Sequence, residues 1–465
     1  MDRHYLWHFF EPKGVAIVGA RSTPGFGFQL PIWMKKHGHE DKIFMVNPRG
    51  GTLHGLPVYE SLSKIPPKVD LAVIITPAPA VPRVLLELAG AGIKNVIIES
   101  AGFAETDESG KALQEKCKAI ASDKGLRVMG PNCVGVVNTE NKFATSEAIE
   151  AVLKPGRIGV VAQSGVFGSI LLDCFPSKGL AISRGVTLGN RLGVNECDVL
   201  DFFCDDPMTK VVLMYIEGAA DGVKLRASLE RITPKKPVIV LKSGRTAEGK
   251  AAAASHTGSM SGSDEIYDGL FAQTGAIRVS GVGEMIDFAG VFDRQPLPKG
   301  NRICVVTTSG SMGAVSIDAA VKGGLVAASL SDKTVNRVRE GSPSWMNVRN
   351  PLDVGPSGMF RKAFESALDD AGVDMLLLFC TIPYAVIEGF GAFGINARMW
   401  LGPIGEIRRQ APEKPVLAAI TGHPDWAQQM REISGDGVSL VEYPENAARA
   451  LVELERYARF KKERE

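Results

Sequence analysis

The chain contains a series of short apolar runs, each ending in a loop rich in Gly, Ser or Pro. Residues 14–19 (GVAIVG), 71–75 (LAVII) and 95–99 (NVIIE) are the first clear examples. Runs this short and this continuous are typical of parallel strands that are covered on both faces. Because helical patterns at residues 29–36, 81–91 and 108–124 separate them, the alternation predicts an α/β fold that begins with a Rossmann-like domain.

Two later segments repeat one pattern. IGVVAQSGVFGS begins at Ile158 and ICVVTTSGSMGA begins at Ile303, and each indicates a strand, a Ser-Gly loop and a helix. This similarity indicates an internal repeat of a unit of about 150 residues. A Pro-rich hinge lies at residues 295–300, and a chain of 465 residues has room for about three domains. We therefore expect domains at residues 1–150, 151–295 and 300–465.

Charge and cysteine content exclude several classes of protein. A formal net charge of +1 argues against a broad nucleic-acid interface, which needs an excess of basic residues. No apolar run approaches the length of about 18 residues that a membrane span needs, and the N-terminus has no signal-peptide pattern. The cysteines show no paired spacing, which is typical of reduced thiols in the cytoplasm; they are Cys117, Cys133, Cys174, Cys197, Cys204, Cys304 and Cys380.

The loop after the first apolar run favours a phosphate ligand. Its glycines are Gly19, Gly25 and Gly27, which do not match G-x-G-x-x-G. A site for NAD would need an acidic residue at the end of the second strand, but Asn47 stands there and Arg49 follows. A cofactor with an additional phosphate, such as NADP or coenzyme A (CoA), suits this loop better, and a structural turn is the alternative.

A second stretch, residues 242–264, is small, Gly-rich and almost free of bulky side chains, with His256 at its middle. Such a segment moves at low cost, and its histidine can accept a proton, bind a metal or attack an electrophile. Helices that begin at two Ser-Gly loops could together hold a phosphoryl group. A histidine between them would then carry phosphate, and Glu217, at the end of a strand, would hold its other ring nitrogen.

The alternatives to this interpretation are weaker. Gly249 and Lys250 resemble the end of a P-loop, but Ala251 stands where Ser or Thr should bind magnesium. His37 and His39 lie near Glu40 in a polar helix end, where we expect solvated side chains and no metal site. An incidental histidine and a solvated loop carboxylate remain the alternatives for the two proposed catalytic residues.

The motifs identify a family resemblance that covers essentially the whole chain in order. VAIVGARSTPGFG, VNPRGGTLHGLPVY, AGFAE, GPNCVGVVN, AQSG, YIEG, AAAASHTGS and NPLDVG resemble the α subunits of NDP-forming acyl-CoA synthetases, relatives of succinyl-CoA synthetase. The resemblance implies a Rossmann-like CoA-binding domain followed by two flavodoxin-like doubly wound domains. It also implies the reversible conversion of acyl-CoA, ADP and phosphate to carboxylic acid, CoA and ATP, through acyl phosphate and phosphohistidine.

The resemblance assigns roles to particular residues. His256 corresponds to the phosphorylated histidine and Glu217 to the glutamate that stabilises it. The residues expected at the phosphate or substrate are Gln163, Ser164, Gly165, Ser309, Gly310 and Ser311. The residues expected to hold CoA are Gly19, Ser22, Thr23, Gly25, Gly27, Asn47, Arg49, Thr76, Pro77, Pro79, Glu99, Ser100 and Ala101. Arg49 replaces a lysine of succinyl-CoA synthetase, which keeps the charge but changes the contact geometry.

One part of the expected enzyme is missing from this sequence, because no ATP-grasp domain follows the third α/β unit. We therefore expect a separate ATP-grasp β subunit in an α2β2 assembly, with ADP or ATP and Mg on that partner. A CoA-binding regulatory or scaffold protein without turnover is one alternative, and an NADP-dependent oxidoreductase is another.

Overall fold

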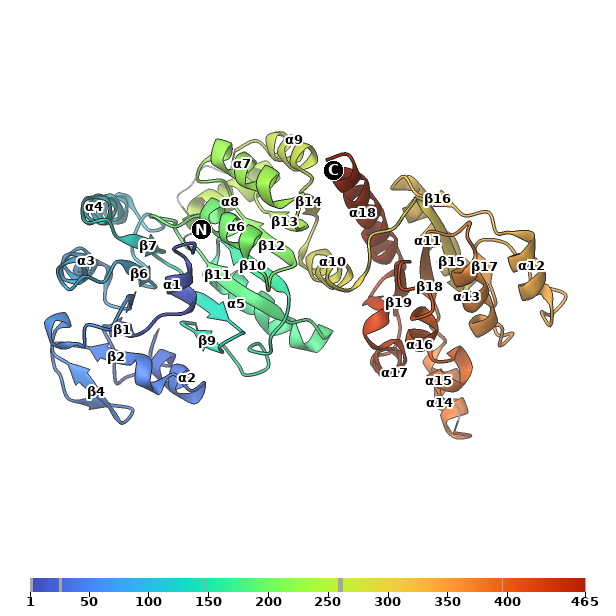
Figure 1. The fold of residues 1–465 in the computed structure, drawn as a ribbon, viewed down its shortest axis with the longest axis horizontal. Coiled ribbons are helices and arrows are strands. Elements are labelled where there is room, and N and C mark those ends of the chain that lie inside the picture. Colours follow the sequence, from blue (N-terminus) through green and yellow to red (C-terminus); the bar gives the residue numbers. More distant parts are fainter. Residues whose placement is uncertain (1–2, 25–26, 147, 258–261, 395, 465) are drawn as a thin grey trace. The chain divides into compact units, whose positions relative to one another are not determined.

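The structure is a computed structural model that describes residues 3–24, 27–146, 148–257, 262–394 and 396–464, without the side chains of residues 253–257 and 390. The chain forms two compact units, Met1–Ser280 and Gly281–Glu465. The first unit holds two sheets and the second unit holds a third (Figure 1). Each unit is described by itself below.

The first sheet has the strand order β3-β4-β2-β1-β5-β6-β7. All neighbouring strands are parallel except β3 and β4. The chain leaves β1 for β2 on one side and returns to β5 on the other, so the carboxyl ends of β1 and β5 form a topological switch point. The strands are Val15–Val18 (β1), Ile43–Val46 (β2), Thr52–Leu53 (β3), Leu56–Tyr59 (β4), Leu71–Ile74 (β5), Asn95–Ile98 (β6) and Arg127–Met129 (β7).

Capping residues mark the start and the end of the main helix beside the first sheet. In α4 (Glu108–Lys124), the Asp107 side chain accepts the Gly110 amide at the N-cap, and Gly125 ends the helix with a φ of +63°. Helix α4 packs beside α3 (Figure 1). The other helical segments are Trp7–Phe10 (α1), Leu30–Lys36 (α2), Glu40–Lys42 (η1), Leu62–Lys64 (η2), Ala78–Ala80 (η3) and Val81–Gly90 (α3).

The second sheet has the order β14-β13-β12-β10-β11-β8-β9. Its five parallel strands follow the flavodoxin-like order, with a switch point between β10 and β12. Strands β8 and β9 precede residue 150, the expected domain boundary, but belong to this sheet because β8 pairs with β11. The strands are Val136–Asn138 (β8), Phe143–Ala144 (β9), Ile158–Ala162 (β10), Ile182–Thr187 (β11), Val211–Ile216 (β12), Val238–Lys242 (β13) and Ile277–Val279 (β14).

Helices accompany this sheet in the expected alternation. Helices α6 and α7 pack against each other, and α9 contacts α7 (Figure 1). The helical segments are Gly165–Cys174 (α5), Pro176–Lys178 (η4), Glu196–Asp205 (α6), Gly222–Ile232 (α7), Ala247–Thr257 (α8) and Asp264–Thr274 (α9).

The second unit repeats the flavodoxin-like order as β16-β15-β18-β19-β20, with the short β17 paired to the end of β15. Helix α10 (Val282–Arg294) packs on α18 and β20, so it belongs with this sheet although we expected the third domain to start at residue 300. The strands are Arg302–Thr307 (β15), Val326–Ala327 (β16), Leu352–Asp353 (β17), Met375–Phe379 (β18), Val416–Ala419 (β19) and Ser439–Val441 (β20). The remaining helical segments are Gly310–Lys322 (α11), Asp332–Arg339 (α12), Phe360–Asp369 (α13), Tyr384–Gly391 (α14), Ala397–Leu401 (α15), Ile404–Arg408 (α16), Pro424–Ser434 (α17), Gly435–Gly437 (η5) and Pro444–Lys462 (α18).

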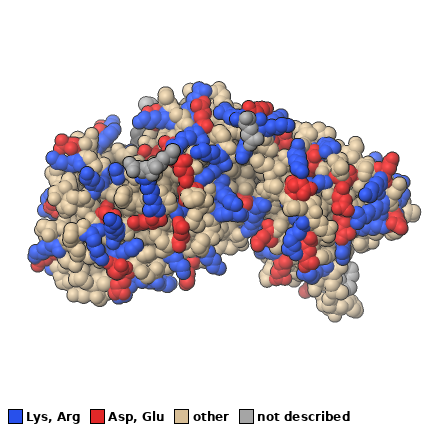
Figure 2. Space-filling model, viewed as in Figure 1, with Lys and Arg blue, Asp and Glu red and all other residues tan. Residues whose placement is uncertain are grey.

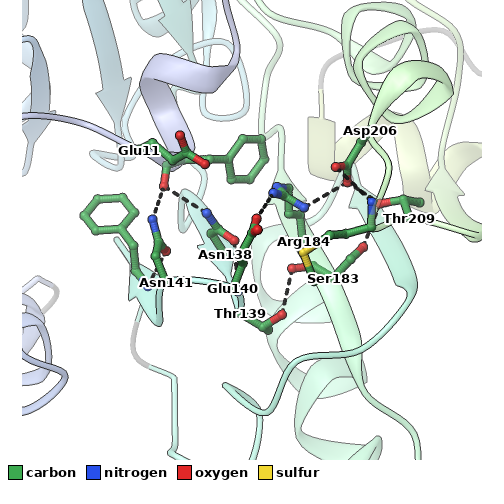
Figure 3. A network of polar contacts seen from close by, with 12 residues as sticks. Glu11, Asn138, Thr139, Glu140, Asn141, Ser183, Arg184, Asp206 and Thr209 are labelled. Carbon is green, nitrogen blue, oxygen red and sulfur yellow. Dashed lines mark hydrogen bonds and ion pairs between the residues drawn. The ribbon is translucent and has the colours of Figure 1, made fainter.

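A buried polar network joins the second sheet to the segment that carries α1 (Figure 3). The Arg184 guanidinium, which has no solvent exposure, pairs with Asp206 at 2.9 Å and with Glu140 at 2.6 Å. The amides of Asn138 and Asn141 donate to the carbonyl of Phe10 at 3.2 and 3.1 Å. These contacts fix the N-terminal segment against the second sheet within the first unit.

Acidic and basic side chains are interspersed over the face of the molecule in Figure 2, where no broad field of one sign appears. This mixture agrees with the formal net charge of +1. Among the described residues, no helix combines the length and the apolar character that crossing a bilayer requires.

Candidate active site

The loop that follows β1 requires glycine at its first position. Gly19 has a φ of +97°, and a Cβ there would lie 2.7 Å from Thr76 Cγ2 and 2.9 Å from the Thr76 backbone nitrogen. Asn47, at the end of β2, donates from its amide to the Ala20 carbonyl at 2.9 Å and holds the same loop. The ends of β1, β2 and β5 are thus packed closely at the switch point of the first sheet.

A cavity of about 970 Å³ opens at this edge of the sheet. Its wall includes four of the residues that we expected to hold CoA, and these are Gly19, Asn47, Thr76 and Pro77. It also includes Glu60, Ser61, Arg83 and Glu87, which our sequence reasoning missed because they come from η2, α3 and neighbouring turns. The cavity lies in the upper part of the size range of ligand pockets, so it has room for a large cofactor.

Other residues expected to hold CoA lie outside the cavity wall. Glu99 and Ser100 are buried at the end of β6, where the Ser100 hydroxyl donates to the Thr76 carbonyl at 2.5 Å. Ser100 therefore joins the ends of β5 and β6. The others outside the wall are Ser22, Thr23, Arg49, Pro79 and Ala101, all exposed, and Gly27, which packs on Ile75. Gly25 lies outside the described residues.

Glu217 follows β12 at the switch point of the second sheet, and only 5% of the residue is exposed. Its Oε1 accepts a hydrogen bond from the Tyr215 hydroxyl at 3.4 Å. Its Oε2 is buried and has no hydrogen-bond partner among the residues that the structure describes. An unpartnered carboxylate oxygen is costly to bury, so this atom is a ready acceptor for a donor that arrives at the site.

Gln163 holds the turn that carries Glu217. Its Oε1 accepts the backbone amides of Glu217 at 2.9 Å and Gly218 at 3.4 Å. The residue is only 2% exposed. This contact gives Gln163 a structural role that the sequence did not indicate, and its contact with phosphate stays a prediction.

Ser164 caps α5 as its residue type predicts. Its hydroxyl oxygen accepts the Phe167 amide at 3.4 Å, and the helix begins at Gly165. The Phe167 ring stacks on Tyr215, with ring centroids 4.0 Å apart. The N-terminus of α5 and the carboxylate of Glu217 therefore lie on neighbouring strand ends and are joined through Tyr215.

Tyr215 and Lys242 are further site residues that we missed. The Tyr215 hydroxyl reaches Ser243 Oγ at 3.2 Å, and burial raises the pKa of this phenol. Lys242 is 1% exposed; its ammonium donates to the Ser243 carbonyl and lies 4.8 Å from the centroid of the Tyr267 ring. Burial lowers the pKa of Lys242. The sequence did contain one signal for Lys242, because a lysine at the end of an otherwise apolar strand is unusual and can indicate a functional residue.

The stretch around His256 contains a helix, where we expected a loop. Residues 247–257 form α8, because the run Ala251–Ala254 consists of the strongest helix former. The side chain of His256 lies outside the described residues. Before α8, Gly244 has a φ of +70°, and Arg245 contacts Asp264 of α9 at 3.5 Å. This ion pair joins the residue stretch before α8 to the start of α9.

The prediction of a solvated helix end at His37 and His39 was wrong for His39. This residue is 7% exposed, and its Nε2 lies 3.0 Å from the Asn141 carbonyl oxygen. Burial lowers the pKa of His39, so a neutral ring that donates to the carbonyl fits the site.

The other Ser-Gly loop lies in the second unit, at the start of α11. Ser309 is the N-cap, and its hydroxyl lies 3.0 Å from that of Ser311. A Cβ on Gly310 would lie 2.5 Å from Asp353 Oδ2, so a larger residue would displace this carboxylate. Joint phosphate binding by the two Ser-Gly loops stays a prediction.

Two family models match the first unit and the start of the second. Residues 13–139 match the CoA binding domain, and residues 155–292 match the succinyl-CoA ligase like flavodoxin domain. The chain is 33% identical over 458 residues to the α subunit of acetate–CoA ligase [ADP-forming] II from Pyrococcus furiosus, covering 98% of each chain.

Two further comparisons extend this similarity. The chain is 40% identical over 383 residues to acetate–CoA ligase [ADP-forming] II from Archaeoglobus fulgidus, covering 80% of this chain but only 56% of that relative's length. A solved structure of dinucleotide forming acetyl-coenzyme A synthetase 1 from Ca. Korarchaeum cryptofilum, in complex with phosphate and ADP, matches with a TM-score of 0.86 at 28% identity. That match covers 99% of this chain and 98% of the other.

Proposed function

Because the chain belongs to the family of ADP-forming acetate–CoA ligase α subunits, we propose that it catalyses the acyl and phosphoryl transfers of an ADP-forming acyl-CoA synthetase. The overall reaction converts acyl-CoA, ADP and phosphate reversibly to carboxylic acid, CoA and ATP. The observation that carries this proposal is the buried Oε2 of Glu217, which lies at a sheet switch point without a partner among the described residues.

In the first step, a phosphate oxygen attacks the thioester carbon, the carbon–sulfur bond breaks, and CoA leaves as the thiol with a proton from phosphate. In the second step, an imidazole nitrogen of His256 attacks phosphorus, and the acid leaves as a carboxylate. Before and during this attack, Glu217 accepts the hydrogen bond of the other ring nitrogen, which fixes the reactive tautomer and balances the positive charge that develops. The phosphoryl group finally moves to ADP.

CoA supplies the thiol for this chemistry. The residues at the edge of the first sheet suit the binding of CoA. The 970 Å³ cavity offers the volume, and Gly19 allows a ligand to approach the backbone closely. We assign CoA contacts in the cavity wall to Asn47, Thr76 and Pro77. The exposed Arg49 is free to turn its guanidinium toward a phosphate of the cofactor.

We also propose a separate ATP-grasp β subunit in an α2β2 assembly, which would hold ADP or ATP with Mg. The longer Archaeoglobus fulgidus relative and the relatives named subunit alpha support a second part of the enzyme. No nucleic acid or membrane enters this function, and the seven free thiols suit the cytoplasm. We propose three domains, one for each sheet; the pairing of β8 with β11 and the packing of α10 on α18 support boundaries before residue 136 and near residue 281.

The test is phosphorylation of the purified chain by acetyl-CoA and radioactive phosphate. We expect acid-labile, base-stable phosphate on the unaltered chain and none on His256→Ala. Glu217→Gln should lose the phosphohistidine while it still binds CoA in calorimetry. Equal labelling of His256→Ala would overturn the assignment of the carrier residue.

The same preparation separates the two alternatives. A scaffold protein would bind CoA but show no turnover with an ATP-grasp subunit and ADP. An oxidoreductase would bind NADP in the calorimeter, where we expect CoA to bind and NADP not to.

A further inference from the structure

We propose that Arg191 and Glu196 are positioning residues for Glu217, an inference that rests on the proposed function of that glutamate. Arg191 lies in the loop that follows β11, Glu196 is the first residue of α6, and neither touches the reacting atoms. They hold the backbone of the turn Glu217–Ala220, and this turn sets where the free oxygen of Glu217 points.

The contacts of this pair are direct and partly buried. Arg191 Nη1 donates to the Gly218 carbonyl at 2.5 Å and to Glu196 Oε2 at 3.1 Å. Glu196 Oε1 accepts the Ala220 amide at 2.7 Å. The two side chains are 7% and 0% exposed. Glu196 is also the first residue of α6, where the helix dipole stabilises a carboxylate.

With two further side chains, the pair holds a polar backbone group of every residue in the turn. Gln163 accepts the amides of Glu217 and Gly218, and the Tyr267 hydroxyl accepts the Ala219 amide at 2.7 Å. Four side chains from four different segments thus fix four consecutive residues. Such dense bonding of one short turn restricts the position of the carboxylate that it carries.

The backbone of Arg191 is itself strained. Its φ is +57°, in the left-handed region that residues with a side chain rarely occupy. Strain of this kind persists where the surroundings over-determine it, often at functional sites. A buried ion pair is also weak support for stability by itself. Two unfavourable features at one residue therefore point to a role in positioning.

The neighbouring Asn190 faces the first sheet instead. Its amide donates to Glu105 Oε2 at 2.6 Å and to Gln114 Oε1 at 2.8 Å. Glu105 Oε1 in turn accepts the Gly102 amide at 2.6 Å, beside the segment Glu99–Ala101 that we expected to hold CoA. Asn190 thus contacts the expected CoA side of the loop, and Arg191 contacts the Glu217 turn. A substitution of Asn190 should therefore change mainly KM, and one of Arg191 should change mainly the maximal rate.

The step that depends on the pair is the attack of His256 on acyl phosphate. The nitrogen–phosphorus bond forms, the bond from phosphorus to the acyl oxygen breaks, and the acid leaves as a carboxylate. Glu217 holds the proton on the other ring nitrogen throughout. A displacement of the carboxylate by about 1 Å costs about 100-fold in rate, because alignment of the ring is lost.

The experiment follows phosphohistidine formation at a series of acetyl-CoA concentrations in Arg191→Met, Arg191→Lys and Glu196→Gln. We expect the maximal rate to fall about 100-fold in Arg191→Met, with an apparent KM within about twofold of the unaltered chain. Arg191→Lys should recover part of the rate, because the ammonium restores a donor to the Gly218 carbonyl. The matched control is Glu230→Gln, which breaks the exposed pair of Arg226 and Glu230 on α7.

Hydrogen exchange supplies a readout that does not depend on catalysis. The amides of residues 217–220 should exchange faster in Arg191→Met and Glu196→Gln, while those of β12 keep their protection. Unchanged exchange of the turn overturns the proposal, as does an unchanged maximal rate in Arg191→Met or a loss that appears only in KM. If the unaltered chain forms no phosphohistidine, the proposed function is overturned instead. The two failures can be told apart, because this one appears in the chain without any substitution.

Discussion

Replacement of Gln163 by Met tests how much the Glu217 turn depends on one acceptor. Methionine has nearly the same length and volume as glutamine, so the substitution leaves little cavity. It removes the Oε1 that accepts the Glu217 amide at 2.9 Å and the Gly218 amide at 3.4 Å. Both donors lie in a buried part of the protein, where water does not replace the lost acceptor.

The expected loss in the free energy of unfolding follows from these two hydrogen bonds. A buried donor left without a partner costs about 1–3 kcal/mol, and the longer contact contributes the smaller share. Burial of the less polar thioether offsets part of this cost. We therefore expect Gln163→Met to lower the free energy of unfolding of this region by about 2 kcal/mol.

Hydrogen exchange of peptides from β10 and β12 is the suitable assay, because a chain with two units need not unfold in one transition. A loss of about 2 kcal/mol corresponds to about 30-fold faster exchange of amides that exchange by unfolding. Gln410→Met is the control, since it makes the same change at an exposed position of the second unit and should leave the exchange of these peptides unaltered. Exchange of Gln163→Met at the rate of the unaltered chain would refute the reasoning.

Three further predictions concern other parts of the first unit. Gly19→Ala should weaken CoA binding at least about 10-fold in calorimetry, because its Cβ collides with the loop after β5; Gly38→Ala, with a similar positive φ but open space, should not. Asp206→Asn should lower the free energy of unfolding by about 3 kcal/mol in a urea titration, because it leaves the buried Arg184 guanidinium of Figure 3 with only the half-exposed Glu140 as its anionic partner. In the same titration, Glu140→Gln should cost less than about 1 kcal/mol. Burial by itself would raise the pKa of Glu105, but hydrogen bonds from the Asn190 side chain and nearby backbone amides lower it below the ordinary 4.5. Its ionised form therefore stabilises the fold above pH 4.5, and the advantage over Glu105→Gln should shrink as the pH falls through the folded-state pKa.

The strand and helix pattern could be predicted closely from local sequence. The expected helix at residues 108–124 coincides with α4, the expected strand that begins at Ile158 forms β10, and the run at residues 95–99 agrees with β6 to within one residue. These elements are readable because each is a short apolar run or a capped helical pattern whose signal lies within its own residues. The stretch before His256 misled us, because its small residues suit a flexible loop and an Ala-rich helix equally well.

The candidate site was predictable only in part. Gly19, Ser164 and Glu217 stand directly after apolar strands, at the sheet edge where α/β proteins bind ligands. Arg191, Glu196 and the wall residues from η2 and α3 carry no local mark of function. Burial of His39 was missed for the same reason, because its partner Asn141 comes from a distant segment of the chain.

The sequence by itself determined the α/β class, the two repeated strand-loop-helix segments and the positions of the ligand-binding strand ends, because all of these follow from the order of apolar and small residues along the chain. Only the tertiary structure decided which side chains surround Glu217. The residues that hold its turn lie 24 to 55 positions in the sequence from the turn residues that they contact. They meet there because the strand order places β10, β12 and β13 side by side, and such pairing depends on the packing of the whole sheet.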